Sequence, residues 1–114
     1  YEIYMGDWSS DVCSSDLLYR YERDVDGLPP GEGAFGICSF WAVDYLVCRG
    51  DVDAARKMFE HVISLANDVG LFAEEIDPED GSQLGNFPQA FTHVGVIFAA
   101  LSLARAQRRK EHDR

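Results

Sequence analysis

The sequence is poor in basic residues, and this shortage argues against one large class of partner. Its 114 residues hold 10 lysines and arginines against 20 aspartates and glutamates, which gives a formal net charge of −10. Binding to nucleic acid needs a surplus of Lys and Arg to neutralise phosphates, so we expect no nucleic-acid partner. The one basic cluster falls at the end of a helical pattern, where cations stabilise the helix dipole: Arg105, Arg108, Arg109 and Lys110.

Long apolar runs are also missing. No stretch approaches the roughly 20 consecutive apolar residues that a membrane-spanning helix needs, and no positively charged leader of the secretory kind is present. We therefore expect no membrane partner. The expectation of a cytoplasmic location is based instead on cysteine usage.

Motifs for metals and nucleotides are lacking as well. The histidines His61, His93 and His112 have neither a CxxC nor an HExxH context, so no metal site is expected. We expect His93 to be a histidine whose ring is satisfied within a buried helix. Gly31 and Gly33 lack the preceding strand and the third glycine of a phosphate-binding loop. The sequence therefore predicts no cofactor.

The first 17 residues have neither the period of a helix nor that of a strand. The run Asp7 to Leu17, DWSSDVCSSDL, resembles one reading frame of a widely used sequencing-library adapter. Appended segments are set aside before the fold is considered, so we expect residues 1–17 to be a non-native, adapter-derived tail. Without them 16 acidic residues stand against 10 basic ones, a net charge of −6. Residues 18–114 are long enough for one small domain.

Cysteine is scarce, and its spacing argues against a disulfide. Cys13 falls in the predicted tail, which leaves Cys38 and Cys48. Ten residues of helix separate two positions by about 15 Å, and a disulfide bridges no more than roughly 7 Å between Cα atoms. We expect two reduced thiols in the core, as is typical of a reducing compartment.

Two neighbouring stretches have the hydrophobic patterns of helices. The stretch from Phe35 to Val47 is apolar on nearly every side, with Asp44 as its one charge, which predicts a helix buried on most faces. The stretch from Val52 to Val69 carries apolar residues at steps of three and four, which predicts an amphipathic helix with one wet side. Asp51 or Asp53 is a candidate N-cap for it, and Gly70 is a candidate for the residue that ends it.

A third helix is predicted from Phe87 to Gln107, with Asn86 as its cap and Pro88 in its first turn. Its middle, VGVIFAALSLA, is again apolar nearly all round. Two such helices need more covering than one amphipathic helix supplies. The pattern therefore predicts a slice of a larger layered all-α fold in which inner and outer helices alternate.

The same alternation predicts where the loops lie. The loop that ends at Gly33 and the loop that holds Glu74 both lead into buried helices. Both should therefore open at the same end of the inner layer. This places Glu32 on one face with Glu74 and Glu75.

The acidic segment from Leu71 to Phe91, LFAEEIDPEDGSQLGNFPQAF, is the best candidate for chemistry. Glu74 and Glu75 follow three apolar residues, and a carboxylate held against apolar walls can act as an acid or a base. The alternative, which spacing alone leaves open, is a solvated acidic linker between two helices.

Four aromatic residues lie near these loops and could stack on sugar rings: Phe40, Trp41, Phe87 and Phe91. Aromatic side chains at such positions more often belong to the core. The core interpretation is stronger for Trp41 than for Phe87 and Phe91.

Two segments resemble a known family. EGAFGICSFW, from Glu32 to Trp41, and AEEIDPEDGSQLGNFPQAFTH, from Ala73 to His93, are similar to the C-terminal part of bacterial glycoside hydrolase family 15, which includes glucoamylases and bacterial trehalases. The similarity extends over about residues 18–107. It implies an all-α fold, with about three helices of an (α/α)6 barrel whose inner ring carries the active site at one rim.

The resemblance also implies a reaction. The family hydrolyses α-glucosidic bonds with inversion, using one carboxylic acid to protonate the leaving oxygen and one carboxylate to activate water. Its base lies in the motif S/A-E-[QE]-x-D followed by Gln-Leu, which residues 73–77 and 83–84 match, so Glu74 takes the position of the general base. Glu75 is the less favoured alternative. Glu32, Phe87 and Phe91 are weaker candidates for substrate binding.

Three hypotheses for function follow. The favoured one is the C-terminal fragment of an inverting, exo-acting α-glucoside hydrolase of the glucoamylase type, which acts on α-glucan oligosaccharides. A trehalase of the same family, acting on trehalose, is the alternative within this class. A non-catalytic helical interaction module is the alternative outside it, disfavoured because the helical halves share no repeat.

The general acid should lie outside the chain, in the missing N-terminal part of the same enzyme, which is the expected protein partner. Inversion needs two carboxyl groups roughly 6.5–9.5 Å apart. We therefore expect residues 18–114 alone to leave maltose, maltooligosaccharides and trehalose intact.

Overall fold

The computed structural model describes residues 17–19 and 33–112. These residues form three helices, α1 (Gly36–Cys48), α2 (Val52–Ser64) and α3 (Ala90–His112), and three two-residue strands, β1 (Ala34–Phe35), β2 (Glu75–Ile76) and β3 (Gln83–Leu84). Glu32, Cys13 and residues 1–16 of the predicted tail lie outside the described residues. The mainly helical architecture confirms the predicted all-α class of a barrel fragment.

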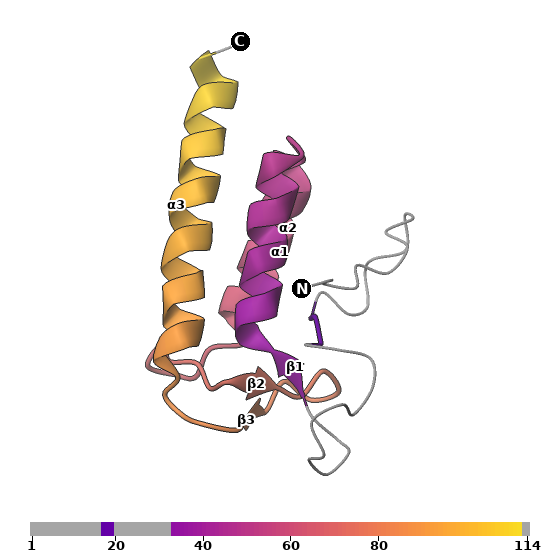
Figure 1. The fold of residues 1–114 in the computed structure, drawn as a ribbon, viewed down its shortest axis with the longest axis vertical. Helices are drawn as coiled ribbons and strands as arrows, with labels where there is room; N and C mark the ends of the chain where they lie inside the picture. The colour runs from indigo at the N-terminus through magenta and orange to yellow at the C-terminus, as the bar shows by residue number, and fades with distance from the viewer. Residues whose placement is uncertain (1–16, 20–32, 113–114) are drawn as a thin grey trace.

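The inner helices α1 and α3 stand side by side, and both begin at the end of the molecule that holds the small sheet (Figure 1). The strands pair antiparallel in the order β1-β2-β3, with Phe35 opposite Glu75 and Glu75 opposite Leu84. The two loops that lead into α1 and α3 therefore meet at one end of the molecule, as the helical alternation predicted. The strands themselves were not predicted, because two residues are too few to show an alternating pattern.

The core lies between the three helices and is centred on Phe40 of α1, which is fully buried. Its ring meets Phe72 edge-on at a centroid distance of 5.6 Å and Phe59 at 6.1 Å. Helix α2 contributes Ala55, Met58 and Val62 at steps of three and four. This buried side confirms the amphipathic pattern read from the sequence.

Helix α3 packs against α1 through small residues. Its buried positions are Thr92, Gly95, Ala99 and Leu103, again at helical spacing. A Cβ atom added at Gly95 would lie 2.6 Å from Ile37 Cδ1 and 3.2 Å from Phe40 Cβ. The two helices therefore approach most closely where α3 has no side chain.

Both later helices differ from their predicted bounds. Helix α2 ends at Ser64 rather than Val69, because the Asn67 side chain accepts a hydrogen bond from the Leu71 N–H at 2.8 Å and holds the chain in a turn. Gly70, with φ of 77°, belongs to that turn and not to the helix end.

Helix α3 begins at Ala90 rather than Phe87, and it runs on to His112 instead of ending at Gln107. The N–H of Gln89 is bonded to the Phe72 carbonyl outside the helix. Asn86 bonds to Glu74 and does not cap the helix.

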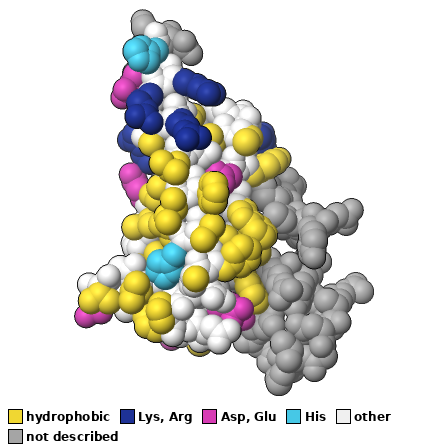
Figure 2. Space-filling view, turned by 60° about the vertical axis from the view of Figure 1, so that its left-hand side comes forward, with side chains coloured by type: hydrophobic (Ala, Val, Ile, Leu, Met, Phe, Trp, Pro, Cys, Tyr) yellow, Lys and Arg dark blue, Asp and Glu magenta, His cyan; other side chains and the backbone are white. Residues whose placement is uncertain are grey.

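The opposite side of α3 is exposed, which agrees with the expectation that two helices apolar nearly all round need more covering than one amphipathic helix supplies. We call the five exposed side chains the α3 apolar surface: Phe91, Val94, Ile97, Phe98 and Leu101, which are 43–63% exposed. Figure 2 shows hydrophobic side chains gathered along this helix, below a group of Lys and Arg at its C-terminal end. Within the described residues, the chain supplies no second layer to cover this surface.

By length and composition α3 is also apolar enough to cross a membrane, which the lengths of the apolar runs in the sequence did not indicate. Core helices of soluble proteins meet the same criterion.

The two cysteines in the described part of the chain are reduced, as predicted. Cys38 is buried, but Cys48 is exposed at the end of α1, so the expectation of two core thiols is wrong for Cys48. Lys110 pairs with Asp53 at 2.8 Å and joins the end of α3 to the start of α2. Both side chains are well exposed, so the pair contributes about 1 kcal/mol at most.

Candidate active site

The backbone of Glu74 is held between the two inner helices. Its N–H donates to the carbonyl of Asn86 at 2.9 Å, just before α3, and its carbonyl accepts from the N–H of Gly36 at 3.0 Å, at the start of α1. The residue therefore lies at the rim where both helices begin. This is the position that the sequence pattern predicted for it.

The carboxylate of Glu74 is half-buried and is held on one oxygen. Its Oε2 accepts a hydrogen bond from Asn86 Nδ2 at 2.9 Å and a longer one from the Asn86 N–H at 3.4 Å. No residue that the structure describes donates to Oε1. The group is thus oriented by the protein and keeps an oxygen that can accept a proton from water.

Glu75 has a different surrounding. Its Oε2 accepts a hydrogen bond from the N–H of Gly33 at 2.8 Å and ties β2 to the loop before α1. Successive side chains of an extended chain point to opposite sides. The two adjacent glutamates therefore serve different neighbours.

The residue before Glu74 is fixed by two polar side chains. Gln83 Oε1 accepts from the Ala73 N–H, and Gln83 Nε2 donates to the carbonyl of Leu65 at 2.8 Å. Thr92, buried in α3, donates its hydroxyl to the Ala73 carbonyl at 3.1 Å. The sequence pattern indicated Gln83 only as part of a motif and did not indicate Thr92. A lone hydroxyl on the buried stripe of an apolar helix was the available signal for Thr92.

His93 is a structural histidine, as the sequence predicted. Its Nε2 accepts a hydrogen bond from the Phe72 N–H at 3.3 Å, and its Nδ1 lies 2.7 Å from the carbonyl of Gln89. The tautomer with hydrogen on Nδ1 satisfies both contacts. Because both ring nitrogens bond to backbone, the ring supports the loop that carries Glu74.

Three of the four aromatic candidates are open to solvent in this chain, whereas Phe40 is buried in the core. Phe87 is 50% and Phe91 is 53% exposed, and the Phe91 ring meets Trp41 edge-on at 5.9 Å. Trp41 is 42% exposed, so its expected place in the core is wrong for this chain. Contacts of Phe87, Phe91 and the undescribed Glu32 with a substrate remain predictions.

The acidic loop between β2 and β3 is a hydrogen-bonded turn. The Asp77 N–H donates to the Ser82 carbonyl at 2.8 Å, and Asp80 Oδ1 accepts from the Ser82 N–H at 2.8 Å. Hydrogen bonds from the Ser82 side chain and backbone lower the pKa of Asp80 below its ordinary value of 3.8. The Asp80 carboxylate therefore shapes the turn, and its hydrogen-bond partner is Ser82 rather than Glu74.

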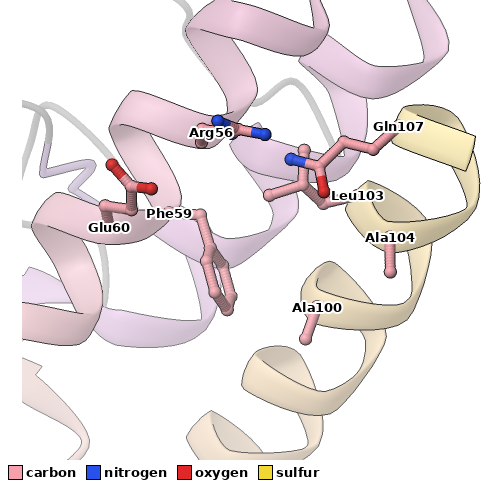
Figure 3. Close-up of a pocket in the computed structure, with 7 residues that line it drawn as sticks. All are labelled: Arg56, Phe59, Glu60, Ala100, Leu103, Ala104 and Gln107. Carbon is pink, nitrogen blue, oxygen red and sulfur yellow. The ribbon is translucent and has the colours of Figure 1, made fainter. Parts of the chain in front are cut away.

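A separate pocket of about 340 Å³ opens between α2 and α3, away from the sheet (Figure 3). It is lined by Arg56, Phe59, Glu60, Ala100, Leu103, Ala104 and Gln107. With its amide oxygen facing Arg56, Gln107 accepts two hydrogen bonds of 2.9 Å from that guanidinium. The pocket shares no residue with the predicted site.

Two helices that begin at one end of the molecule, with the Glu74 loop bonded between them, are consistent with a fragment of an α/α barrel. The family Glycosyl hydrolases family 15 matches residues 3–101, and the chain belongs to this family. The match begins within the segment predicted to be a tail. Leu17, the last residue of that segment, is buried in the core, and the boundary after residue 17 stays a prediction.

The chain is similar to several curated trehalases. It is 48% identical over 91 residues to the trehalase of Mycolicibacterium smegmatis, a match that covers 80% of this chain and 14% of the relative. It is 48% identical to the trehalase of Mycobacterium tuberculosis, covering 80% and 13%, and 44% identical to that of Thermoplasma acidophilum, covering 84% and 16%. The chain thus spans about one seventh of the length of these relatives. No solved structure shows significant similarity to it.

Proposed function

We propose that this chain is the base-bearing part of a larger inverting glycoside hydrolase that acts on trehalose. The observation that carries the proposal is the Glu74 carboxylate, held through Oε2 at the rim where α1 and α3 begin. The trehalase names of the relatives support trehalose over the α-glucan oligosaccharides of a glucoamylase. They reverse the order of preference that the sequence analysis gave.

In the proposed reaction, Glu74 accepts a proton from a water molecule as the water oxygen attacks the anomeric carbon of one glucose unit. The bond from that carbon to the bridging oxygen breaks, and the general acid, outside this chain, protonates the oxygen. The attacked unit leaves as β-glucose, because attack from the opposite face inverts its anomeric carbon. The other unit keeps its own anomeric bond and leaves as α-glucose.

Glu74 is favoured over Glu75 as the base because of their hydrogen bonds. Glu75 Oε2 accepts a hydrogen bond from the Gly33 N–H, and this bond joins two loops. The carboxylate of Glu74 accepts its hydrogen bonds from Asn86, which belongs to the same rim loop. Both bonds go to Oε2, so Asn86 orients the carboxylate without occupying Oε1.

The test is Glu74→Gln in the complete protein that contains this segment. We expect kcat on trehalose to fall by about 10²- to 10⁴-fold, since Gln cannot accept the proton. Glu75→Gln is the matched control, because its amide oxygen can still accept from Gly33, and we expect kcat within a few-fold of wild type. A loss confined to Glu75→Gln would assign the base to Glu75, and full activity of both variants would favour the non-catalytic helical module.

The substrate is tested by comparing kcat/KM on trehalose with kcat/KM on maltooligosaccharides. We expect trehalose to be preferred, with α- and β-glucose released in equal amounts in the first seconds of a proton NMR time course. A preference for maltooligosaccharides would restore the glucoamylase hypothesis. Release of α-glucose alone would contradict inversion.

A further inference from the structure

Asn86 and Glu74 hold each other through three hydrogen bonds. The Glu74 N–H donates to the Asn86 carbonyl at 2.9 Å, Asn86 Nδ2 donates to Glu74 Oε2 at 2.9 Å, and the Asn86 N–H points to the same oxygen at 3.4 Å. The two residues are 12 positions apart in the chain. From this geometry we infer that Asn86 is a positioning residue for the general base, an inference that rests on the proposed role of Glu74.

Asn67 shows what a purely structural asparagine does in the same region. Its Oδ1 accepts hydrogen bonds from the backbone of Leu71 at 2.8 Å and of Val69 at 3.2 Å, which closes a turn. Asn86 instead directs its side-chain amide at a carboxylate. The Asn86 side chain is exposed and fills no core space, so its contact with Glu74 is the feature that a substitution removes.

Gly85 brings the loop close enough for these bonds. Its φ is 74°, in the left-handed region that favours glycine. A Cβ atom at this position would lie 3.1 Å from Glu74 Oε2 and 3.3 Å from Glu74 Cβ. The backbone of residues 85 and 86 therefore packs closely against the Glu74 side chain. Any larger residue at Gly85 would displace the carboxylate.

The contact sets the plane of the carboxylate. The last torsion of a free Glu side chain has a broad distribution, so without a partner Oε1 would point toward the attacking water only part of the time. A bond of 2.9 Å to Oε2 fixes the plane and with it the direction of Oε1. A misplacement of about 1 Å in such a group can lower the rate by about 10²-fold.

The experiment uses the complete protein and Asn86→Ala. We expect kcat on trehalose to fall by about 10- to 100-fold while KM stays within about two-fold, because the base is misplaced and substrate binding is kept. Asn86→Asp should lose at least as much, since it replaces the donor with a like charge. Asn67→Ala is the matched control: we expect a lower unfolding temperature with kcat unchanged.

A double-mutant cycle separates positioning from general damage. If Asn86 acts through Glu74, adding Asn86→Ala to Glu74→Gln should change the residual rate by less than about two-fold. The inference is overturned if Asn86→Ala keeps wild-type kcat, if it raises KM and leaves kcat alone, or if it lowers the rate of Glu74→Gln as much as that of wild type. If Glu74→Gln itself is fully active, the proposed function fails and the inference fails with it.

Discussion

At the scale of single residues, the hydrogen-bond partner decides what a carboxylate can do. Glu74 and Glu75 are adjacent and chemically the same, yet one is oriented by Asn86 and the other ties down Gly33. Asp80, a few residues on, is fully exposed and serves its own turn. Identical functional groups within one short segment thus have three different roles.

Asp80 gives a prediction about pH. Because Ser82 lowers its pKa in the folded chain, the contribution of Asp80 to stability is fully present above the ordinary value of 3.8 and is lost as pH falls through the lower folded value. Carbon NMR of the Asp80 carboxyl should therefore give a titration midpoint below 3.8.

Ser82→Ala tests the cause of this shift. It removes the hydroxyl contact and keeps the backbone N–H, so we expect the midpoint to rise part of the way back. An unchanged midpoint would show that the hydroxyl is not responsible.

At the scale of helices and strands, the site depends on the close approach of α1 and α3. Gly95 allows this approach, since α1 side chains occupy the space where its Cβ would stand. The small sheet then joins the loops at the start of both helices. These loops hold Glu74 in position, because its backbone bonds to Gly36 on one side and to Asn86 on the other.

Gly95→Ala tests this packing. Alanine gains about 1 kcal/mol of helix propensity over glycine, but inserting a methyl group into a packed contact costs about 1–3 kcal/mol. Ile37 Cδ1 can rotate away, whereas Phe40 Cβ, 3.2 Å from the new atom, is fixed to its backbone. We expect a net loss of stability, measured as a lower unfolding temperature of the complete protein.

Ala104→Gly on the same helix removes helix propensity together with a partly buried methyl group and should also lower the unfolding temperature. A rise in unfolding temperature for Gly95→Ala would show that the contact between α1 and α3 can accommodate an added methyl group.

At the scale of the whole molecule, the described helices leave one apolar face uncovered. The α3 apolar surface carries five exposed large side chains, and Trp41 and Tyr45 of α1 are also exposed. Exposed apolar patches of this kind are typical of association surfaces. In a barrel, the neighbouring inner helices would lie against this face.

The isolated chain should therefore self-associate. We expect light scattering to give a mass above the 12.8 kDa of one chain, increasing with concentration. Phe98→Glu should reduce association, because it places a charge in the middle of the α3 apolar surface. Arg108→Glu, on the same helix but outside that surface, is the control and should leave association unchanged. A monomer at all concentrations would contradict the prediction.

The sequence by itself determined the helices, the inner and outer layers, the common rim and the acidic segment placed there. These features follow from apolar spacing of three and four residues, which depends on near neighbours in the chain. The end of α2 and the start of α3 were placed wrongly because Asn67 and Asn86 bond to groups that helical spacing does not reveal.

The tertiary structure alone decided the partner of each glutamate, the short strands and which side of α3 is exposed. The bonds of Glu74 and Glu75 span 12 and 42 residues of chain. Such contacts exist only after the helices have packed and brought the two loops together. The sequence could therefore name both carboxylates and their rim, but only the folded chain shows that one of them bonds to Asn86 and the other to Gly33.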